Sequence, residues 1–411
     1  MRRWLLILTL VQGALADTDV WDLPPLLYSD SRPNNALSKL AADLASGARK
    51  IESATGLDRL RFVLKALRVR EESQVLVFSK TSFQNPLIHP QNPRSLYFSE
   101  DAYVGYVPGG SIEAIIQDPL LGPVFYVIDA NHSGVLKIER DLSSCISCHG
   151  TSNTEIVPGM QVRSVFSDQD GRPLLAMGTT QVNHETPLSE RWGSYYVTGR
   201  SSLPHLGNRT YIEDAVAEPK PSDLRDLTST LDVSKYLRPT SDIVALLVQE
   251  HQCRIHNLLN AATLQYRRAA YLTRALDPQS DPDVGSAGRV ADGMVHRIVE
   301  CLFFKDEADP GEGIEGGEEF QKMFEARYPR TRAGDSLADF QLNERIFKRR
   351  CSFMINSSAF HNLPARVKSA VFGKMQVILS GDDPAYAWLK APERKQVAAI
   401  LAETLPEWPR K

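Results

Sequence analysis

Three short stretches decide the fold: AYVGYV at residues 102–107, SIEAII at 111–116 and PVFYVI at 123–128. Each is rich in β-branched and aromatic residues, and turn-forming Pro, Gly, Asn or Asp residues separate them, as is typical of strands in a sheet. QVLVFS at 74–79 and SLYF at 95–98 have the same character. The sequence therefore predicts a run of five short strands.

The flanking segments extend this domain in both directions. Leucine and phenylalanine recur at three- and four-residue spacings from Asn35 to Arg70, which indicates helix with a break at Gly56. On the other side, VRSVFS at 162–167 and LLAMG at 174–178 enclose an Asp-Gly turn and predict a hairpin. The predicted fold class is α+β, with residues 17–208 forming a strand-rich domain behind an N-terminal helical segment.

The second half of the chain has a different pattern. Residues 209–240 are polar and contain three prolines, so they are expected to form a linker. Residues 241–411 predict an all-α domain, whose first helix, capped by Ser241 or Asp242, runs to about Ala275. Further helices are expected near 289–304, 318–327, 337–356, 364–379 and 392–403, with an acidic, glycine-rich loop at 306–319.

The first sixteen residues predict export. Arg2 and Arg3 precede an apolar run at 4–11, and Ala14 and Ala16 are the small residues of a cleavage site, so residues 1–16 are expected to be a signal peptide. A membrane anchor is the alternative. No later stretch approaches the roughly 18 apolar residues of a spanning helix. We therefore expect a periplasmic or secreted protein without a transmembrane segment after cleavage.

The composition is that of an ordinary globular protein. The chain is 42% hydrophobic and has a formal charge of -3, which becomes about -5 once the two leader arginines are removed. This balance favours neither disorder nor binding to nucleic acid.

Cys145, Cys148 and His149 form the motif CISCH, the attachment signature of a c-type haem. The two-residue gap lets both thiols reach the vinyl groups of one porphyrin edge, and the adjacent imidazole can bind the iron as an axial ligand. Predicted export agrees with this, because c-type haem is attached after export. A zinc site would need two more ligands at suitable spacing, and a thioredoxin-like dithiol would stand near the start of a βαβ domain. The motif therefore predicts one covalent haem c.

The second axial ligand would set the behaviour of the iron. The candidates are Met160, Met177, His184 and His205, with His132 upstream. A methionine raises the reduction potential and a second histidine lowers it, whereas an open position allows a small ligand to bind. His205, in a polar loop near the end of the predicted haem domain, is the tentative choice. Met160 follows Pro-Gly and is free to reach the iron, while Met177 is expected to pack in the core.

Other polar residues have two interpretations each. Arg191, next to a tryptophan, could pair with haem propionates or polarise a bound peroxide, or it could belong to a structural turn. His251 and His256 are five residues apart and do not share a helix face, whereas His296 and Glu300, four apart, do. An exposed ion pair or a core histidine is favoured there over a second metal site.

Three further cysteines, Cys253, Cys301 and Cys351, lie in the helical half. An oxidising compartment would allow one disulfide and one free thiol, with no pairing favoured by the sequence. Three buried thiols are the equal alternative.

The motif makes the chain resemble the c-type cytochromes. In their small soluble class the motif lies near the start of a helical domain, with a methionine ligand downstream, whereas here more than a hundred residues and several predicted strands precede it. The chain is more similar to a family of large exported bacterial proteins described only as cytochrome c domain-containing. The segments that carry this resemblance are 73–84, 103–110, 145–150, 191–199, 205–208 and 241–246. The resemblance implies haem binding and electron transfer, and it implies no particular reaction or catalytic residue.

Three functions are therefore expected, in this order. The first is periplasmic electron transfer to a redox partner protein. The second is a peroxidase-like enzyme with an open iron, for which His205 and Arg191 would supply the distal groups. The third is a redox or gas sensor, which ranks last because no output domain follows.

Overall fold

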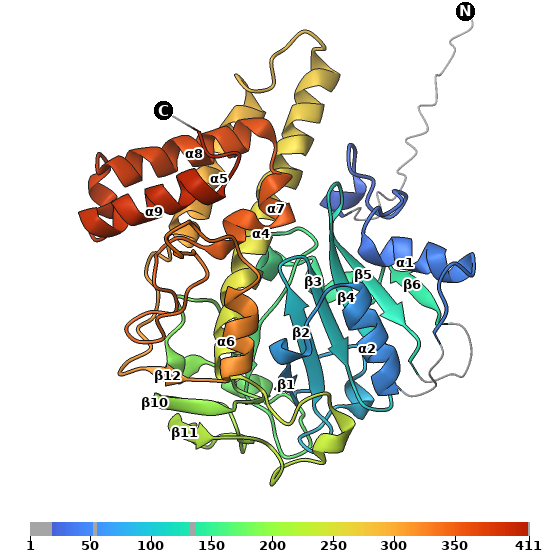
Figure 1. Cartoon of the computed structure of the whole chain (residues 1–411). Helices are drawn as coiled ribbons and strands as arrows, with labels where there is room; N and C mark the ends of the chain where they lie inside the picture. The colour runs from blue at the N-terminus through green and yellow to red at the C-terminus, as the bar shows by residue number, and fades with distance from the viewer. Residues whose placement is uncertain (1–18, 52–55, 131–135, 410–411) are drawn as a thin grey trace, which may run out of the picture.

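A seven-stranded antiparallel sheet occupies the centre of the N-terminal half of the computed structural model, which describes residues 19–51, 56–130 and 136–409 (Figure 1). Its strand order is β6-β5-β4-β3-β2-β1-β9. The strands are β1 (Val75–Val77), β2 (Arg94–Ser99), β3 (Ala102–Tyr106), β4 (Ile112–Asp118), β5 (Gly122–Ile128), β6 (Ile138–Asp141) and β9 (Tyr195–Tyr196). The five predicted strands are confirmed. The expected signal peptide and His132 lie outside the described residues.

The two faces of this sheet pack against different helices. Strand residues alternate between the faces, so the paired Val104 and Ala114 point one way and the paired Tyr103 and Ile115 the other. The first face packs on α1 (Ala36–Ala45) and α2 (Gly56–Ala66), which confirms the predicted N-terminal helices. On the second face, the Tyr103 hydroxyl lies 2.8 Å from Nδ1 of His256 in the long helix α4.

Smaller sheets complete the strand-rich part. β7 (Arg163–Val165) pairs with β8 (Thr179–Gln181), and a third sheet has the order β11-β10-β12. The strand predicted at 174–178 is wrong, because this stretch forms a 3-10 turn with an exposed Leu175 and a left-handed Gly178. A short apolar run does not by itself distinguish a strand from such a turn.

The third sheet joins segments that the sequence separates. β10 (Gly199–His205) pairs with β11 (Lys220–Leu224), which lies inside the predicted linker, and with β12 (Ile314–Glu315), inside the predicted acidic loop.

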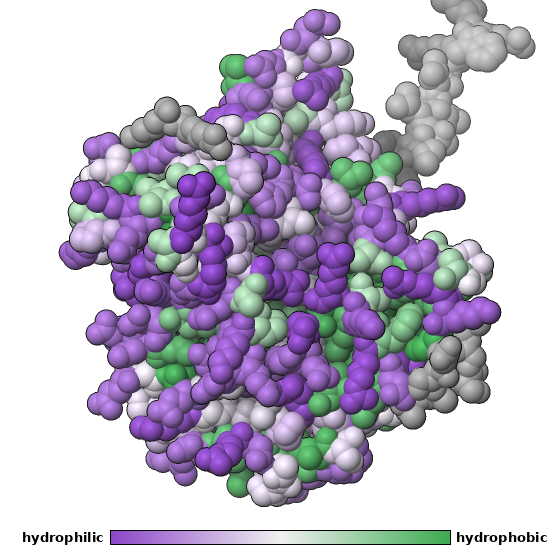
Figure 2. Space-filling view, in the orientation of Figure 1, coloured by the Kyte–Doolittle hydropathy of each residue, from purple (hydrophilic) through white to green (hydrophobic). Residues whose placement is uncertain are grey.

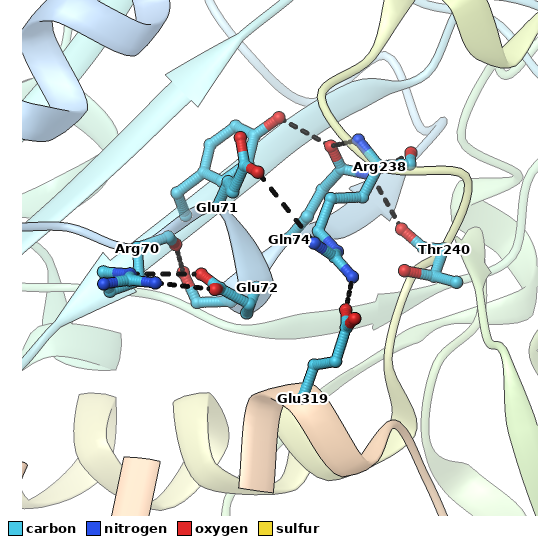
Figure 3. Close-up of polar contacts among 9 residues, drawn as sticks. Arg70, Glu71, Glu72, Gln74, Arg238, Thr240 and Glu319 are labelled. Carbon is cyan, nitrogen blue, oxygen red and sulfur yellow. Dashed lines mark hydrogen bonds and ion pairs between the residues drawn. The ribbon is translucent and has the colours of Figure 1, made fainter. Parts of the chain in front are cut away.

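Gln74, just before β1, holds the end of the predicted linker next to the central sheet through hydrogen bonds (Figure 3). Its amide donates to the carbonyls of Arg238, at 2.8 Å, and Thr240, at 2.7 Å. The Arg238 guanidinium forms ion pairs with Glu71 and with Glu319 of α6.

The second half is mainly helical. Its helices are α4 (Ile243–Leu276), α5 (Ser286–Leu302), α6 (Glu318–Glu325), α7 (Ser358–His361), α8 (Ala365–Ser380) and α9 (Ala391–Thr404). The helix predicted over 337–356 is wrong: only the 3-10 turn Phe353–Asn356 forms there. The apolar residues of this stretch that mimicked a helical period, Phe340, Phe347 and Phe353, instead pack around Phe324 of α6.

One cluster of buried hydrophobic residues includes side chains from both halves of the chain, among them Val77 and Tyr195 of the sheet and Ile298 and Phe372 of the helices. α4 lies between the sheet and the C-terminal helices, and Arg254 is its only partly exposed residue between Ile243 and Ala262. Polar residues cover most of the face seen in Figure 2, where hydrophobic residues show only in small separate groups. Among the described residues, no helix is apolar over enough length to cross a membrane.

Candidate functional site

The CISCH motif forms a single helical turn at the end of the central sheet. β6 ends at Asp141, whose carboxylate accepts the main-chain N–H groups of Ser143, at 3.1 Å, and Cys145, at 2.8 Å. α3 (Ile146–His149) follows, and the His149 N–H donates to the Cys145 carbonyl at 3.0 Å. The thiols of Cys145 and Cys148 are both free, and both line the same hollow as His149. The structure therefore brings together the three residues of the motif.

His149 is held in one tautomer. Its Nδ1 lies 2.9 Å from the carbonyl oxygen of Gly159, and a carbonyl only accepts, so Nδ1 carries the proton and Nε2 keeps its lone pair. The ring packs against Phe125, with ring centroids 5.4 Å apart. Burial lowers the pKa of His149 to about 4, which keeps the imidazole neutral. A neutral ring fixed by a main-chain carbonyl is the usual state of a histidine that binds a metal through its other nitrogen.

The hollow lies between the second face of the central sheet, α3, the chain at 160–163 and α4. Its cavity volume is about 160 Å³, and it opens to solvent, so a larger group bound there would extend out of it. Its apolar lining includes Val77, Leu96, Ile115, Phe125, Met160 and Val162, and its polar lining includes Arg94, Glu113, Arg163 and Gln249.

Two buried polar atoms beside the hollow have no hydrogen-bond partner: Nε of Arg94 and Oε1 of Gln249. The other end of the Arg94 guanidinium lies 2.5 Å from the Glu113 carboxylate. Arg94 crosses the sheet over Gly105, and a Cβ at that glycine would come within 2.6 Å of the guanidinium. Unpaired buried polar atoms are uncommon, so these two mark a place where a bound group could supply the missing partner.

The loop after the motif is tied to the helices. Glu155 accepts hydrogen bonds from Arg254 of α4 at 2.6 Å and from Arg297 of α5 at 2.6 and 2.8 Å. Asn257 of α4 accepts from the main-chain N–H of Met160 at 2.9 Å and donates to its carbonyl at 2.7 Å. α4 thereby positions Gly159 and, through it, His149. Sequence reasoning missed these residues, because nothing in their spacing links positions a hundred residues apart.

The candidates for the second axial ligand are dispersed. Met160 is buried and lines the hollow. His205 does not line it: its Nε2 lies 2.7 Å from the Ser222 hydroxyl, and its Nδ1 accepts the Gly207 N–H at 3.0 Å. His184 lies in a separate buried cluster, and Met177 is half-buried in the 3-10 turn. Among the described residues, His149 is the one histidine that lines the hollow.

Arg191 has a structural environment. Its guanidinium forms a 2.7 Å ion pair with Glu250 of α4 and donates to the carbonyls of Thr186, at 2.7 Å, and His184, at 3.1 Å. The indole N–H of Trp192 donates to the same carboxylate at 2.6 Å. Arg191 is therefore committed to buried partners and does not line the hollow. The interpretation of Arg191 as a structural residue is therefore supported, and its suggested contact with a haem or peroxide is not.

The remaining sequence alternatives are also resolved. Cys253, Cys301 and Cys351 are three buried free thiols, and Cys253 lines the hollow. His296 forms a 3.1 Å ion pair with Glu300, in which the histidine is exposed, as the favoured interpretation predicted.

A scan against protein-family models and searches of curated proteins and of solved structures found no match to this chain.

Proposed function

We propose that this chain is an exported c-type cytochrome, with one haem c bound covalently through Cys145 and Cys148 and with His149 as an axial ligand. One observation carries the proposal: both free thiols of the motif and the imidazole of His149 line one hollow beside the sheet. Covalent attachment of haem c uses all three side chains together: the two thiols bind the porphyrin edge and the imidazole binds the iron.

The residues around the hollow fit such a group. Leu96, Ile115 and Val162 offer apolar surface to a flat macrocycle, and Phe125 already packs on the ring of His149. Arg94 and Arg163 would hold its propionates through charge-assisted hydrogen bonds, and Arg94 has a donor without a partner.

Haem c, when bound, supplies a one-electron couple. The protein contributes position: Gly159 fixes the imidazole of His149, and α4 fixes Gly159 through Asn257 and Glu155. Cys148 is the exposed one of the two cysteines, so the attached edge lies nearest to solvent at that residue. We expect a redox partner protein to approach there.

A ligand-binding haem protein, either a peroxidase-like enzyme or a sensor, is the second candidate. Among the described residues, the lining of the hollow includes no second histidine, which favours this candidate. Met160 is then the one predicted axial ligand, besides His149, that lines the hollow. Gln249 adds a buried amide oxygen without a partner on the α4 side.

The first experiment tests attachment. The chain is expressed in a host that exports it and attaches c-type haem, and the intact mass and the alkaline pyridine spectrum are measured. We expect the mass of one haem per chain in the wild type and its loss in Cys145→Ser with Cys148→Ser. Cys351→Ala, which changes a buried cysteine away from the hollow, is the matched control and should keep the haem. A wild-type chain without covalent haem in a competent host contradicts the proposal.

The second experiment separates the two candidates. A low-spin spectrum that carbon monoxide does not change supports electron transfer, and Met160→Leu should then make the iron open to carbon monoxide while His205→Asn leaves it closed. A high-spin spectrum that carbon monoxide shifts in the wild type supports the ligand-binding candidate.

A further inference from the structure

A second group of ligand-bearing side chains lies outside the hollow. His184 comes from the loop after β8, His251 from α4 and Cys301 from α5, and one ligand atom of each lies within 4.8 Å of the others. All three side chains are buried. We propose that His184, His251 and Cys301 bind a transition metal ion of the zinc or copper type, separate from the haem iron.

The two imidazoles have the separation of metal ligands. Nδ1 of His184 and Nδ1 of His251 are 3.3 Å apart. In a tetrahedral zinc site with Zn–N bonds of about 2.0–2.1 Å, two nitrogens lie about 3.3–3.4 Å apart. A nitrogen and a thiolate sulfur would lie about 3.6 Å apart. One ring nitrogen of each histidine lies within 4.8 Å of the Cys301 sulfur, so the side chains need to move by at most about 1.2 Å to reach that separation.

One outer ring nitrogen has a partner that suits this arrangement, and the other has a carboxylate nearby. Nε2 of His251 lies 2.7 Å from the Ser352 hydroxyl oxygen, which can accept a hydrogen bond from Nε2–H. In that tautomer Nδ1 keeps its lone pair. Nε2 of His184 is buried without a hydrogen bond, and its nearest carboxylate oxygen, on Glu185, is 3.9 Å away. Metal-binding histidines usually donate their second N–H to such a hydroxyl or carboxylate.

Without a metal ion, the ring nitrogens of His184 and His251 have too few hydrogen-bond partners. Two neutral imidazoles that face each other through Nδ1 share one proton, and Nε2 of His184 then remains buried and unpaired in either tautomer. An ion between the two Nδ1 atoms would use both lone pairs and turn the Nε2–H of His184 toward Glu185.

The surroundings hold the rings and leave a route to the ion. His251 is stacked on Phe304, with centroids 4.0 Å apart and an interplanar angle of 24°. Glu185, Glu300 and Cys301 line a hollow of about 210 Å³ that opens to solvent, which gives an ion a route to the thiol.

The nearby cations are already paired. Arg191 is paired with Glu250 and Arg254 with Glu155. Lys305 is likewise paired with Glu300. Among the described residues, the ion pair of Glu185 is its 3.9 Å approach to His184, so no closer cation holds this carboxylate away from the site. Two imidazoles and a thiolate favour zinc or copper over magnesium or calcium, which prefer oxygen ligands.

The test uses the full-length, haem-loaded protein, so that the thiols of the CISCH motif cannot bind the added metal. The protein is stripped with a chelator and dialysed against Zn²⁺ or Cu²⁺ in separate samples. Bound metal per chain is measured by plasma mass spectrometry, and the ligand shell by X-ray absorption at the metal edge. We expect one added metal per chain, with one sulfur at about 2.3 Å and, for zinc, nitrogen at about 2.0–2.1 Å.

Variants locate the site. Cys301→Ala and His184→Ala should lose the added metal, whereas Cys351→Ala, at a buried cysteine outside the cluster, should keep it. Ser352→Ala should weaken binding by about 10- to 100-fold through the lost partner of His251. Far-ultraviolet circular dichroism checks that each variant is folded.

The proposal fails if the wild type takes up neither metal, if the absorption edge shows no sulfur ligand, or if folded Cys301→Ala binds as tightly as the wild type. The wild-type measurements decide the question even where a variant does not fold. Because haem attachment is read from the intact mass, its failure is distinguishable from failure of this second site.

Discussion

Gly159 lies between His149 and α4, and its missing side chain is needed there. A Cβ at this position would lie 2.5 Å from Oδ1 of Asn257 and 2.8 Å from Cβ of Thr154. The same residue offers its carbonyl to His149. One atom added at residue 159 would therefore disturb both the bond that orients the imidazole and the bond that fixes the loop to the helix.

We expect Gly159→Ala to lower the free energy of unfolding by about 1–3 kcal/mol, as overpacking of a tight site does. Urea unfolding followed by circular dichroism measures this. The matched control is Gly373→Ala in α8, where nothing lies within 4 Å of the added Cβ, and it should be neutral or stabilise by up to about 1 kcal/mol. Equal effects at the two glycines would contradict the packing argument.

His205 should make its own pH-dependent contribution to stability. Burial, with a smaller effect from Arg209, lowers its folded pKa to about 4, against about 6.5 in the unfolded chain. Between these values the unfolded state binds a proton that the folded state does not, so the contribution is present above pH 6.5 and is lost as the pH falls toward 4.

The free energy of unfolding of the wild type, relative to His205→Asn, should therefore decrease by up to about 1.4 kcal/mol per pH unit on acidification through this window. Urea titrations of both proteins from pH 7 to pH 4 measure the difference. A difference that stays constant over this range would contradict the assignment.

At the scale of elements, α4 begins at a defined cap. The Asp242 carboxylate accepts the N–H groups of Val244 at 2.9 Å and Ala245 at 3.0 Å, and it also binds the N–H of Gly317 just before α6. The Asp242 side chain therefore accepts the free N–H groups at the start of α4, the helix that lines the hollow, and links α4 to the segment just before α6.

Asp242→Ala should cost about 0.5–2 kcal/mol of folding free energy, because the first-turn N–H groups lose their acceptor. Asp242→Asn keeps a capping oxygen and should cost much less. Thermal unfolding of the two variants measures the contrast, and similar losses in both would point to the charge of Asp242 and not to its capping bond.

Elements whose local pattern agrees with their final contacts could be predicted from the sequence, and those that distant contacts decide could not. The five strands were predicted from short runs of β-branched and aromatic residues between turn residues, and α4 from its helical pattern, and they were confirmed. The stretch 337–356 has apolar residues at helical spacings, but its aromatic rings pack around Phe324, so tertiary contacts override the local pattern.

The residues of the candidate site likewise divide into those that the sequence could predict and those that it could not. Cys145, Cys148 and His149 are adjacent in sequence, so their spacing alone predicts their chemistry. The groups that complete the site, Asn257 and Gln249 of α4, come from a distant segment. The choice of His205 rested on its place in a polar loop, whereas the structure has it in strand β10 with both ring nitrogens bonded.

At the scale of the whole molecule, sheet and helices share one buried core. Gln249 and Cys253 of α4 line the hollow opposite the strands, and Asn257 holds the loop after the motif. A chain that ends before α4 would expose the apolar second face of the sheet and lose one wall of the hollow.

We therefore expect the full-length protein to unfold in one cooperative transition, with coincident midpoints for near-ultraviolet and far-ultraviolet circular dichroism. A fragment of residues 1–240 should be recovered unfolded or aggregated. Two separate transitions, or a well-folded fragment, would show that the strand-rich half is stable without the helical half.

The position of α4 along the chain also determines the order in which the parts of the site are synthesised. The CISCH motif leaves the ribosome about a hundred residues before the part of α4 that walls the hollow. At about 5–20 residues per second, that interval is about 5 to 20 seconds. During it, Cys145 and Cys148 are made but the α4 wall of the hollow is not, so Cys145, which is partly buried in the finished fold, is most accessible before α4 packs.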